Sequence, residues 1–510
     1  MDKSFYISTP IYYPSANPHM GHAYSSIIAD FFARFKRIDG YDVYFLTGTD
    51  EHGLKIQRAA EKKGLDPLEF CNVISKTFKD LSNTLNLTNT DFIRTTEERH
   101  KKSVQYLWSE LEKNDDIYLS KYSGWYSVSD EAFYNEEEIE ELDGVKVAIN
   151  SKSIVEWIEE ESYFFRLSKW QKPLLDYYEK HADFISPESR KNEVISFVKS
   201  GLKDLSISRK TFSWGIKVPN NNNHVIYVWL DALTNYLSAL NYPEINNELY
   251  KKFWPASIHL IGKDILRFHA IYWPAFLLAA KIDLPKKIYG HGWILSGDEK
   301  MSKSKGNILN PIEIIKKYGI DELRYYLMKE VSHGSDGSIS LKSLENCINS
   351  DLANNYGNLC QRIFSFIKTN CNGKVYKTDS QSTADKNLIK ETKLLEQDLR
   401  ELMNNQNLNN YIKSVINISF LTNKYINDEE PWKLKNKDIK KMNNILHLSL
   451  EQIAKISILL NPIIPKSTSK VLDALNIDTD SRNLSFLNSS NILKEKVKIN
   501  PLNILFKKIN

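Results

Sequence analysis

The first third of the chain alternates short apolar runs with segments whose apolar residues recur every three or four positions. Residues 5–9 and 41–46 predict strands, whereas residues 23–38 and 54–63 predict helices. Strand, helix, strand and helix with short connections is the order in which parallel nucleotide-binding sheets are built. Ligands of such sheets bind beyond the carboxyl ends of the strands, so functional residues are expected there.

The pattern changes twice further along. From about residue 117 to 209 it loosens into acidic and aromatic segments, and a strand-like run returns at 224–228, which predicts an insertion into the sheet domain. After about residue 346, helical periodicity continues almost to the end and predicts a helical bundle. The expected fold class is α/β, with a parallel Rossmann-like sheet, an inserted connective domain and then an all-α domain. The division is 1–116 and 216–295 for the sheet domain, 117–215 for the insertion, 296–345 for a connecting region and 346–510 for the bundle.

Composition narrows the class of protein. The 510 residues are 42% hydrophobic and 12% aromatic, enough to bury the cores of several domains. The four cysteines form no Cys-x-x-Cys pair, which argues against a disulfide framework and suits a reducing compartment. No export signal opens the chain and no apolar run reaches the ~20 residues of a membrane span, so a soluble cytoplasmic protein without membrane contact is expected. The net charge of only +4 places any RNA contact in local patches.

A pair of histidines follows the first predicted strand, in the segment His19-Met20-Gly21-His22. Two imidazoles three residues apart at a helix start can converge on one ligand, and free backbone N–H groups there favour phosphate. Gly21 leaves space for the close approach of a nucleotide. Taken alone, such a pair is more often accidental or part of a metal site.

A second element, Lys300-Met301-Ser302-Lys303-Ser304, lies far downstream. Lysines and hydroxyls on a loop suit a triphosphate whose charge must be neutralised as pyrophosphate leaves, although an exposed basic loop is the simpler alternative. The two elements together, in this order around a parallel-sheet pattern, resemble the His-Ile-Gly-His and Lys-Met-Ser-Lys-Ser signatures of class I aminoacyl-tRNA synthetases.

Three further segments make the resemblance more specific. Thr-Pro-Ile-Tyr-Tyr at 9–13, Gly-Thr-Asp-Glu-His-Gly at 48–53 and Tyr-Val-Trp-Leu-Asp-Ala at 227–232 are similar to segments of methionyl-tRNA synthetases. The resemblance implies an ATP-dependent ligase that forms methionyl-adenylate from L-methionine and MgATP and transfers the methionyl group to the terminal adenosine of tRNA(Met). Two alternatives stay open at this point: another class I synthetase, which chain length and the cysteines oppose, and a non-catalytic tRNA-binding paralogue.

The resemblance also implies roles for individual residues. Asp50 would bind the α-ammonium of methionine, and Gly262 and Asp264 the ribose of ATP, although Asp50 could be a turn residue and Asp264 a helix N-cap. The catalytic residues would be His19, His22, Lys300 and Lys303, with Gly21, Met301, Ser302 and Ser304 also contacting ATP. The expected methionine pocket, which could instead be an ordinary aromatic core, consists of Ile11, Tyr13, Trp229, Ala232, Tyr236, Ile265 and His269.

Two features concern metals and RNA. Many relatives carry zinc-binding cysteines in the insertion, but residues 124–131 contain none, so no structural zinc and no other metal site is expected. The chain ends at residue 510 without the β-barrel appendix of some relatives, which favours a monomer. Asn358 and Arg362 lie one helical turn apart, and the resemblance implies that they and Trp432 read a CAU anticodon; a helix-ending proline followed by a packed tryptophan is the alternative.

Overall fold

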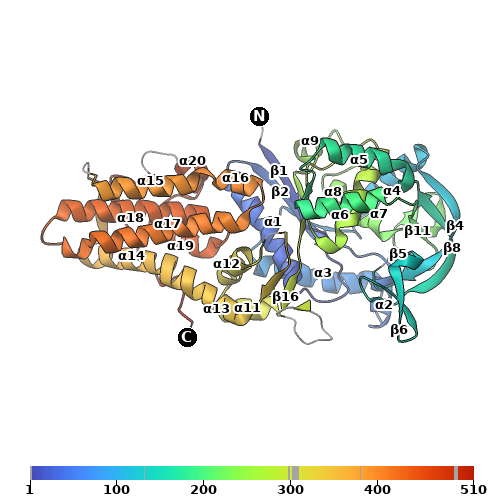
Figure 1. Cartoon of the computed structure of the whole chain (residues 1–510), viewed down its shortest axis with the longest axis horizontal. Helices are drawn as coiled ribbons and strands as arrows, with labels where there is room; N and C mark the ends of the chain where they lie inside the picture. Colours follow the sequence, from blue (N-terminus) through green and yellow to red (C-terminus); the bar gives the residue numbers. More distant parts are fainter. Residues whose placement is uncertain are drawn as a thin grey trace.

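The computed structural model describes residues 3–130, 132–296, 299–300, 309–332, 334–378, 381–487 and 492–509. The described chain is elongated, with a helical bundle at one end, a parallel sheet near the middle and antiparallel strands of the insertion at the other end (Figure 1). Among these residues, no helix has the length and apolar character that crossing a membrane requires.

The central sheet has six parallel strands in the order β3-β2-β1-β14-β15-β9. They are β1 (Ser4–Ser8), β2 (Asp42–Thr49), β3 (Asp91–Arg94), β9 (Ile185–Ser186), β14 (Ile258–Gly262) and β15 (Ile288–His291). The chain moves outward from β1 to β3 in one direction and from β14 to β15 in the other, so the strand order reverses between β1 and β14. Ligands of open α/β sheets bind in the crevice at such a reversal.

Helices cover both faces of the sheet. On one face lies α1 (Met20–Ile38). The ring centroids of its Phe31 and Phe35 each lie 5.5 Å from the ring centroid of Tyr411 in the bundle. One apolar core therefore runs from the sheet into the bundle. The other face packs on α4 (Glu98–Lys113), α7 (Val228–Leu233), α8 (Asn235–Ser238) and α10 (Trp273–Ala279). The helices α2 (Leu54–Glu61) and α3 (Pro67–Thr84) share a small separate core, and α9 (Glu248–Phe253) joins the core of the second face through Phe253. The strands and helices predicted near the N-terminus are confirmed.

Arg324 fixes α1 to the bundle. Its guanidinium lies 2.7 Å from the Asp30 carboxylate of α1 and donates to the carbonyls of Pro462 and Ile463 at 2.9 and 2.7 Å. Burial raises the pKa of Asp30, but Arg324 and Arg34 outweigh it and the pKa is lowered. A fully buried charge persists only when it is paired in this way.

The insertion is built from antiparallel strands and two helices. The long pair β4 (Ile117–Ser127) and β8 (Glu156–Phe165) carries β5 (Ala132–Tyr134) and β10 (Leu205–Ser206) at its edges, followed in the chain by α5 (Gln171–Lys180) and α6 (Glu188–Lys199); β6 (Ile139–Leu142) pairs with β7 (Val145–Ala148). Within the stretch assigned to the insertion, β9 nevertheless joins the parallel sheet beside β15. Because β9 has only two residues, the sequence pattern could not predict a strand there. The domain division stays a prediction.

The strand predicted at 224–228 as the return to the sheet domain needs correction. The run is β13 (Asn221–Ile226), and it pairs antiparallel with β11 (Ser208–Arg209) and β12 (Lys217–Val218) in a separate sheet. The parallel sheet resumes only at β14. An apolar run predicts a strand, but it does not specify which strand will be its partner.

The bundle and its approach are almost entirely helical, which confirms the prediction for the C-terminal third. The helices are α11 (Pro311–Tyr318), α12 (Ile320–Glu330), α13 (Leu341–Cys347), α14 (Asn358–Asn370), α15 (Thr383–Gln397), α16 (Leu399–Asn404), α17 (Leu408–Glu429), α18 (Ile439–Leu460), α19 (Pro465–Ala474) and α20 (Leu484–Leu487). A π-helical segment, Ile348–Gly357, leads into α14. The short strands are β16 (Ile294–Ser296), β17 (Glu299–Lys300), β18 (Gly337–Ile339), β19 (Lys374–Tyr376) and β20 (Lys496–Lys498).

Candidate active site

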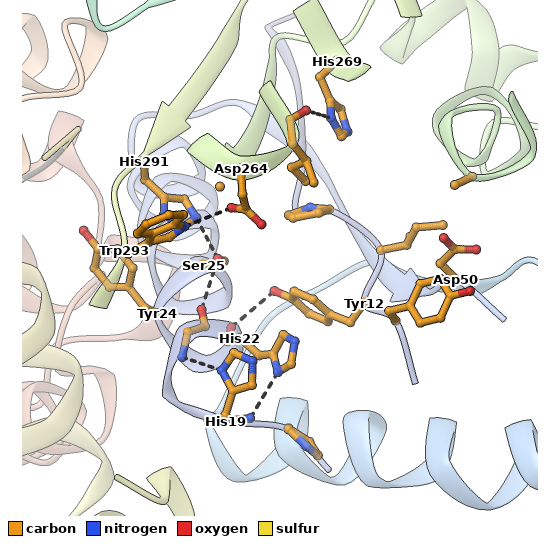
Figure 2. Close-up of a pocket in the computed structure, with 18 of the residues that line it drawn as sticks. Tyr12, His19, His22, Tyr24, Ser25, Asp50, Asp264, His269, His291 and Trp293 are labelled. Carbon is orange, nitrogen blue, oxygen red and sulfur yellow. Dashed lines mark hydrogen bonds between the residues drawn. The ribbon is translucent and has the colours of Figure 1, made fainter. Parts of the chain in front are cut away.

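A cavity of about 720 Å³ opens where the strand order of the sheet reverses, beyond the carboxyl ends of β1 and β14 (Figure 2). Its size suits a small-molecule site. The structure brings together around it the following residues that the sequence analysis selects: Ile11, Tyr13, His19, Gly21, His22, Asp50, Trp229, Ala232, Tyr236, Gly262, Asp264, Ile265 and His269.

The two histidines of the first motif form the cap of α1. The Nδ1 atom of His19 accepts the backbone N–H of Gly21 at 3.1 Å, and Nδ1 of His22 accepts the backbone N–H of His19 at 3.1 Å. The expectation of free backbone N–H groups is therefore wrong at these two positions, because the imidazoles occupy them. A Cβ on Gly21 would lie 2.9 Å from Cε1 of His19, so this glycine also makes room for the imidazole.

The protonation of His22 follows from these contacts. Burial and the neighbouring His19 lower the pKa of His22 well below its usual value, so the ring is neutral at pH 7. Since Nδ1 accepts a hydrogen bond, the single ring proton is on Nε2. His22 can thus donate one hydrogen bond to a phosphate oxygen, but it does not contribute a positive charge.

Across the cavity, β14 and β15 supply polar groups from their carboxyl ends. Gly262 ends β14, and a Cβ there would lie 2.6 Å from Oδ1 of Asp264, so only glycine allows this position of the carboxylate. Oδ1 of Asp264 accepts the indole N–H of Trp293 at 3.3 Å. The alternative of Asp264 as a helix cap is wrong, since Gly262 holds that position without a side-chain bond.

Sequence reasoning misses His291, which borders the same cavity. Its Nδ1 donates to the carbonyl of Gly292 at 2.8 Å, so Nε2 accepts the hydroxyl of Ser25 at 2.7 Å. Burial lowers the pKa of His291 and keeps the ring neutral. The signal that points to it is its place as the last residue of β15, at the edge where β14 ends.

The opposite side of the cavity is aromatic. The ring of Trp229 stacks on Phe268, which the sequence analysis does not select, with centroids 3.6 Å apart and planes 6° apart. The hydroxyl of Tyr236 donates to Nε2 of His269 at 2.7 Å, while Nδ1 of His269 donates to the carbonyl of Ile265 at 3.0 Å. Burial lowers the pKa of His269 to about 4, which agrees with this neutral tautomer.

The local helices on this side differ from the single helix that the spacing suggests. Trp229 and Ala232 lie on α7, but that helix ends at Leu233 and Tyr236 lies on α8. His269 belongs to a π-helical turn, Phe268–Tyr272. These residues still line one pocket, because the turns between the short helices preserve the face that a continuous helix would present.

Asp50 follows β2 directly and is 6% exposed. Its backbone N–H donates to the carbonyl of Tyr12 at 2.9 Å, which places the residue beside the β1–α1 connection. The next residue, Glu51, forms a buried ion pair with Arg94 at 2.7 Å. Asp50 therefore lies on a firmly held loop at the border of the cavity.

The lysine-rich motif is described only at its first residue. Lys300 ends β17, which pairs with β16, and β16 begins at Ile294 on the border of the cavity. The other selected residues of this motif, Met301, Ser302, Lys303 and Ser304, lie outside the described residues.

Within the described ranges, no group of three or more His, Cys, Asp or Glu residues could hold a metal ion. In residues 124–131, the stretch without cysteine, Asp130 accepts hydrogen bonds from the hydroxyls of Tyr134 at 2.7 Å and Ser153 at 2.8 Å. Ser127 and Ser129 lie beside it, with their hydroxyls 3.1 Å apart. Hydrogen bonds between these side chains hold this part of the insertion together.

The three residues selected for RNA contact lie in the bundle. Asn358 is exposed at the start of α14, and Arg362, one turn later, donates to the Asn427 side chain at 2.8 Å. The guanidinium of Arg362 lies 5.6 Å from the ring centroid of Trp432, whose side chain is 41% exposed. The structure thus brings Arg362 and Trp432 together, and the indole is not packed away in the core.

Known proteins of one family are similar to this chain over nearly its whole length. A family model described as tRNA synthetases class I (M) matches residues 5–364, and one described as the anticodon binding domain of methionyl tRNA ligase matches residues 375–510. The methionine–tRNA ligases of Rickettsia bellii and Rickettsia prowazekii are 50% and 49% identical over 94% and 100% of both chains. The Mycobacterium tuberculosis methionyl-tRNA synthetase in complex with methionyl-adenylate is 42% identical and superposes with a TM-score of 0.97 over 99% of both chains.

These matches confirm the predicted α/β fold and the predicted ATP-dependent methionine–tRNA ligase. They support neither the paralogue without activity nor another enzyme of the class. The chain belongs to the methionyl-tRNA synthetase family.

Proposed function

We propose that the 720 Å³ cavity binds methionine and MgATP side by side and joins them as methionyl-adenylate. The observation that carries this proposal is that both selected groups of residues, taken from distant segments of the chain, line one cavity at the reversal of the sheet. The aromatic side around Trp229 receives the amino acid. The side formed by His19, Gly262 and Asp264 receives the nucleotide.

On the amino-acid side, Trp229, Tyr236 and His269 offer polarizable rings to the thioether of methionine, which gains from sulfur–aromatic contact. Ile11, Tyr13, Ala232 and Ile265 complete the apolar wall. The Asp50 carboxylate pairs with the α-ammonium group, and this pairing turns the substrate carboxylate toward the nucleotide.

In the first step, a carboxylate oxygen of methionine attacks the α-phosphate of ATP, and the bond to the bridging oxygen breaks as pyrophosphate leaves with the electron pair. The enzyme contributes alignment and charge stabilisation. Nε2–H of His22 donates to a phosphate oxygen, Gly21 allows close approach, and Lys300 and Lys303 neutralise the departing charge. Mg²⁺ arrives as part of the substrate MgATP, and Met301, Ser302 and Ser304 also bind the nucleotide.

In the second step, a ribose hydroxyl of the terminal adenosine, the 2′-hydroxyl, attacks the carbonyl of the adenylate, and AMP leaves. The bundle selects the tRNA by reading a CAU anticodon through Asn358, Arg362 and Trp432. An exposed indole with an adjacent guanidinium supports this role, because unstacked bases bind aromatic faces and Arg planes. The monomeric state and the cytoplasmic location stay predictions.

The experiment that tests this function is ATP–pyrophosphate exchange screened over the twenty amino acids. We expect exchange with methionine alone among them. Exchange with none would contradict the assignment of the cavity, and exchange with a different amino acid would show that the aromatic side accepts another substrate. Size-exclusion chromatography with light scattering tests the monomer.

A further inference from the structure

A buried chain of three side chains lies behind the methionine side of the cavity. Asp231 belongs to α7, between the pocket residues Trp229 and Ala232, but its side chain is fully buried. Its Oδ2 accepts Nδ1 of His52 at 2.7 Å, and its Oδ1 accepts Nε2 of His100 at 2.7 Å. One carboxylate therefore joins α7 to α4, which carries His100, and to the loop after β2.

A second hydrogen bond holds the other nitrogen of His100. The hydroxyl of Ser238 donates to the carbonyl of Thr234 at 2.9 Å, and its oxygen lies 3.0 Å from Nδ1 of His100. Both nitrogens of His100 are therefore held in hydrogen bonds. Burial raises the pKa of Asp231, but the two histidines outweigh it and the pKa is lowered. A buried carboxylate is stable in this place because both of its oxygens are hydrogen-bonded.

His52 connects the Asp231 carboxylate to the other walls of the pocket. It lies two residues after Asp50, on the same loop, and is 3% exposed. The hydroxyl of Tyr13 donates to the backbone carbonyl of His52 at 2.8 Å. The segments that carry Tyr13, Asp50 and Trp229 are thus linked through a single carboxylate behind the pocket.

The nucleotide side is held in a different way. The side chains of His19 and His22 bond to the first turn of α1, and His291 bonds to Ser25 and Gly292. In the part of the chain that the structure describes, no hydrogen bond joins these groups to His52, Asp231 or His100. A change in the carboxylate should therefore affect one substrate and not the other.

We propose that Asp231, together with His52 and His100, is a positioning residue that sets the affinity for methionine by holding the walls of its pocket at a fixed separation. The three side chains do not touch the substrate. This inference rests on the proposed assignment of the aromatic side of the cavity to methionine.

The test is pyrophosphate exchange by Asp231→Asn, with the KM measured separately for methionine and for ATP. The amide keeps the volume of the side chain but removes the charge that both imidazoles face. We expect the KM for methionine to rise at least tenfold while the KM for ATP stays within twofold. His52→Gln provides a second variant that leaves the Asp231–His100 pair in place, and it should shift the same KM in the same direction even if Asp231→Asn does not fold.

A matched control is Asp116→Asn. This carboxylate is 1% exposed and accepts the Lys169 ammonium at 2.7 Å and the Trp170 indole at 3.1 Å, but it does not border the cavity. We expect a lower melting temperature with both KM values unchanged. If Asp231→Asn and His52→Gln behave like this control, the carboxylate contributes only stability and the proposal is overturned.

Asp50→Asn separates this proposal from the assignment of the pocket. If Asp50→Asn raises the KM for methionine and the Asp231 and His52 variants do not, only the positioning role fails. If Asp50→Asn leaves that KM unchanged as well, the proposed methionine site itself is contradicted.

Discussion

The imidazole of His19 lies on the imidazole of His22, with ring centroids 3.8 Å apart and planes 28° apart. Each ring accepts a backbone N–H in the first turn of α1, so the pair caps the helix and faces the cavity at the same time (Figure 2). The ring of His22 is neutral and has one N–H left to donate. The motif therefore combines a structural bond with a single donor for phosphate.

From this we predict that His22→Ala lowers kcat for methionine-dependent pyrophosphate exchange about 10²–10³-fold, the range for removal of one preorganised donor. His22→Asn keeps a side-chain donor and should lose less. The control is His181→Ala, which changes an exposed histidine remote from the cavity. If His22→Ala exchanges within twofold of the parent, His22 serves only to cap the helix.

Lys303→Ala tests the lysine-rich motif whose first residue, Lys300, ends β17. We expect it to reduce the exchange rate by about 3 kcal/mol of transition-state stabilisation, because a charge donor for the leaving pyrophosphate is lost. Methionine binding measured by calorimetry should change little, since the lysine meets only the phosphates. Lys413→Ala, in the bundle, is the control. Unchanged exchange by Lys303→Ala would show that this motif has no part in the chemistry.

Trp432→Ala should separate activation from tRNA charging. We expect normal pyrophosphate exchange and aminoacylation weakened by about 1–3 kcal/mol, the contribution of one base stacked on an aromatic side chain. Phe420→Ala is the matched control, because Phe420 is also an exposed aromatic of this bundle, at 50% exposure against 41% for Trp432. Equal loss in both reactions would instead indicate that Trp432→Ala unfolds the protein.

His269 predicts how stability depends on pH. In the unfolded chain this histidine binds a proton near pH 6.5, whereas in the folded protein burial lowers its pKa to about 4. Between these values the unfolded state holds more protons, so the free energy of unfolding falls as the pH decreases from 6.5 toward 4. At pH 5 the loss from this group is about 2 kcal/mol.

Urea unfolding at pH 7.5 and pH 5, for the parent and for His269→Gln, measures this contribution. The glutamine cannot titrate, so the variant should lose about 2 kcal/mol less than the parent on acidification. Contributions from buried groups that do not interact with His269 cancel in the difference, whereas the removal of His269 also takes away its charge as one cause of the lowered pKa of His259. Identical pH dependence in the two proteins would show that His269 keeps its ordinary pKa when folded.

Much of the molecule is determined by local sequence. The helical spacing of apolar residues in 23–38 and after residue 346 is enough to predict α1 and the bundle. The spacing shows which face of each helix is buried. The motifs around His19 and Lys300 likewise identify the family, since phosphate chemistry needs particular residue types in short segments. The resemblance to that family, rather than the chemistry of single residues, named the other positions that line the cavity.

Tertiary structure alone decided which groups meet. β9 joins the sheet with two residues, and β13 pairs in a separate sheet, because strand pairing depends on neighbours that the pattern of one strand does not contain. The neutral state of His22 and the contact of Arg362 with Trp432 are further examples. The carboxylate of Asp231 reaches His52 and His100 across 179 and 131 positions of sequence, a relationship that only packing creates.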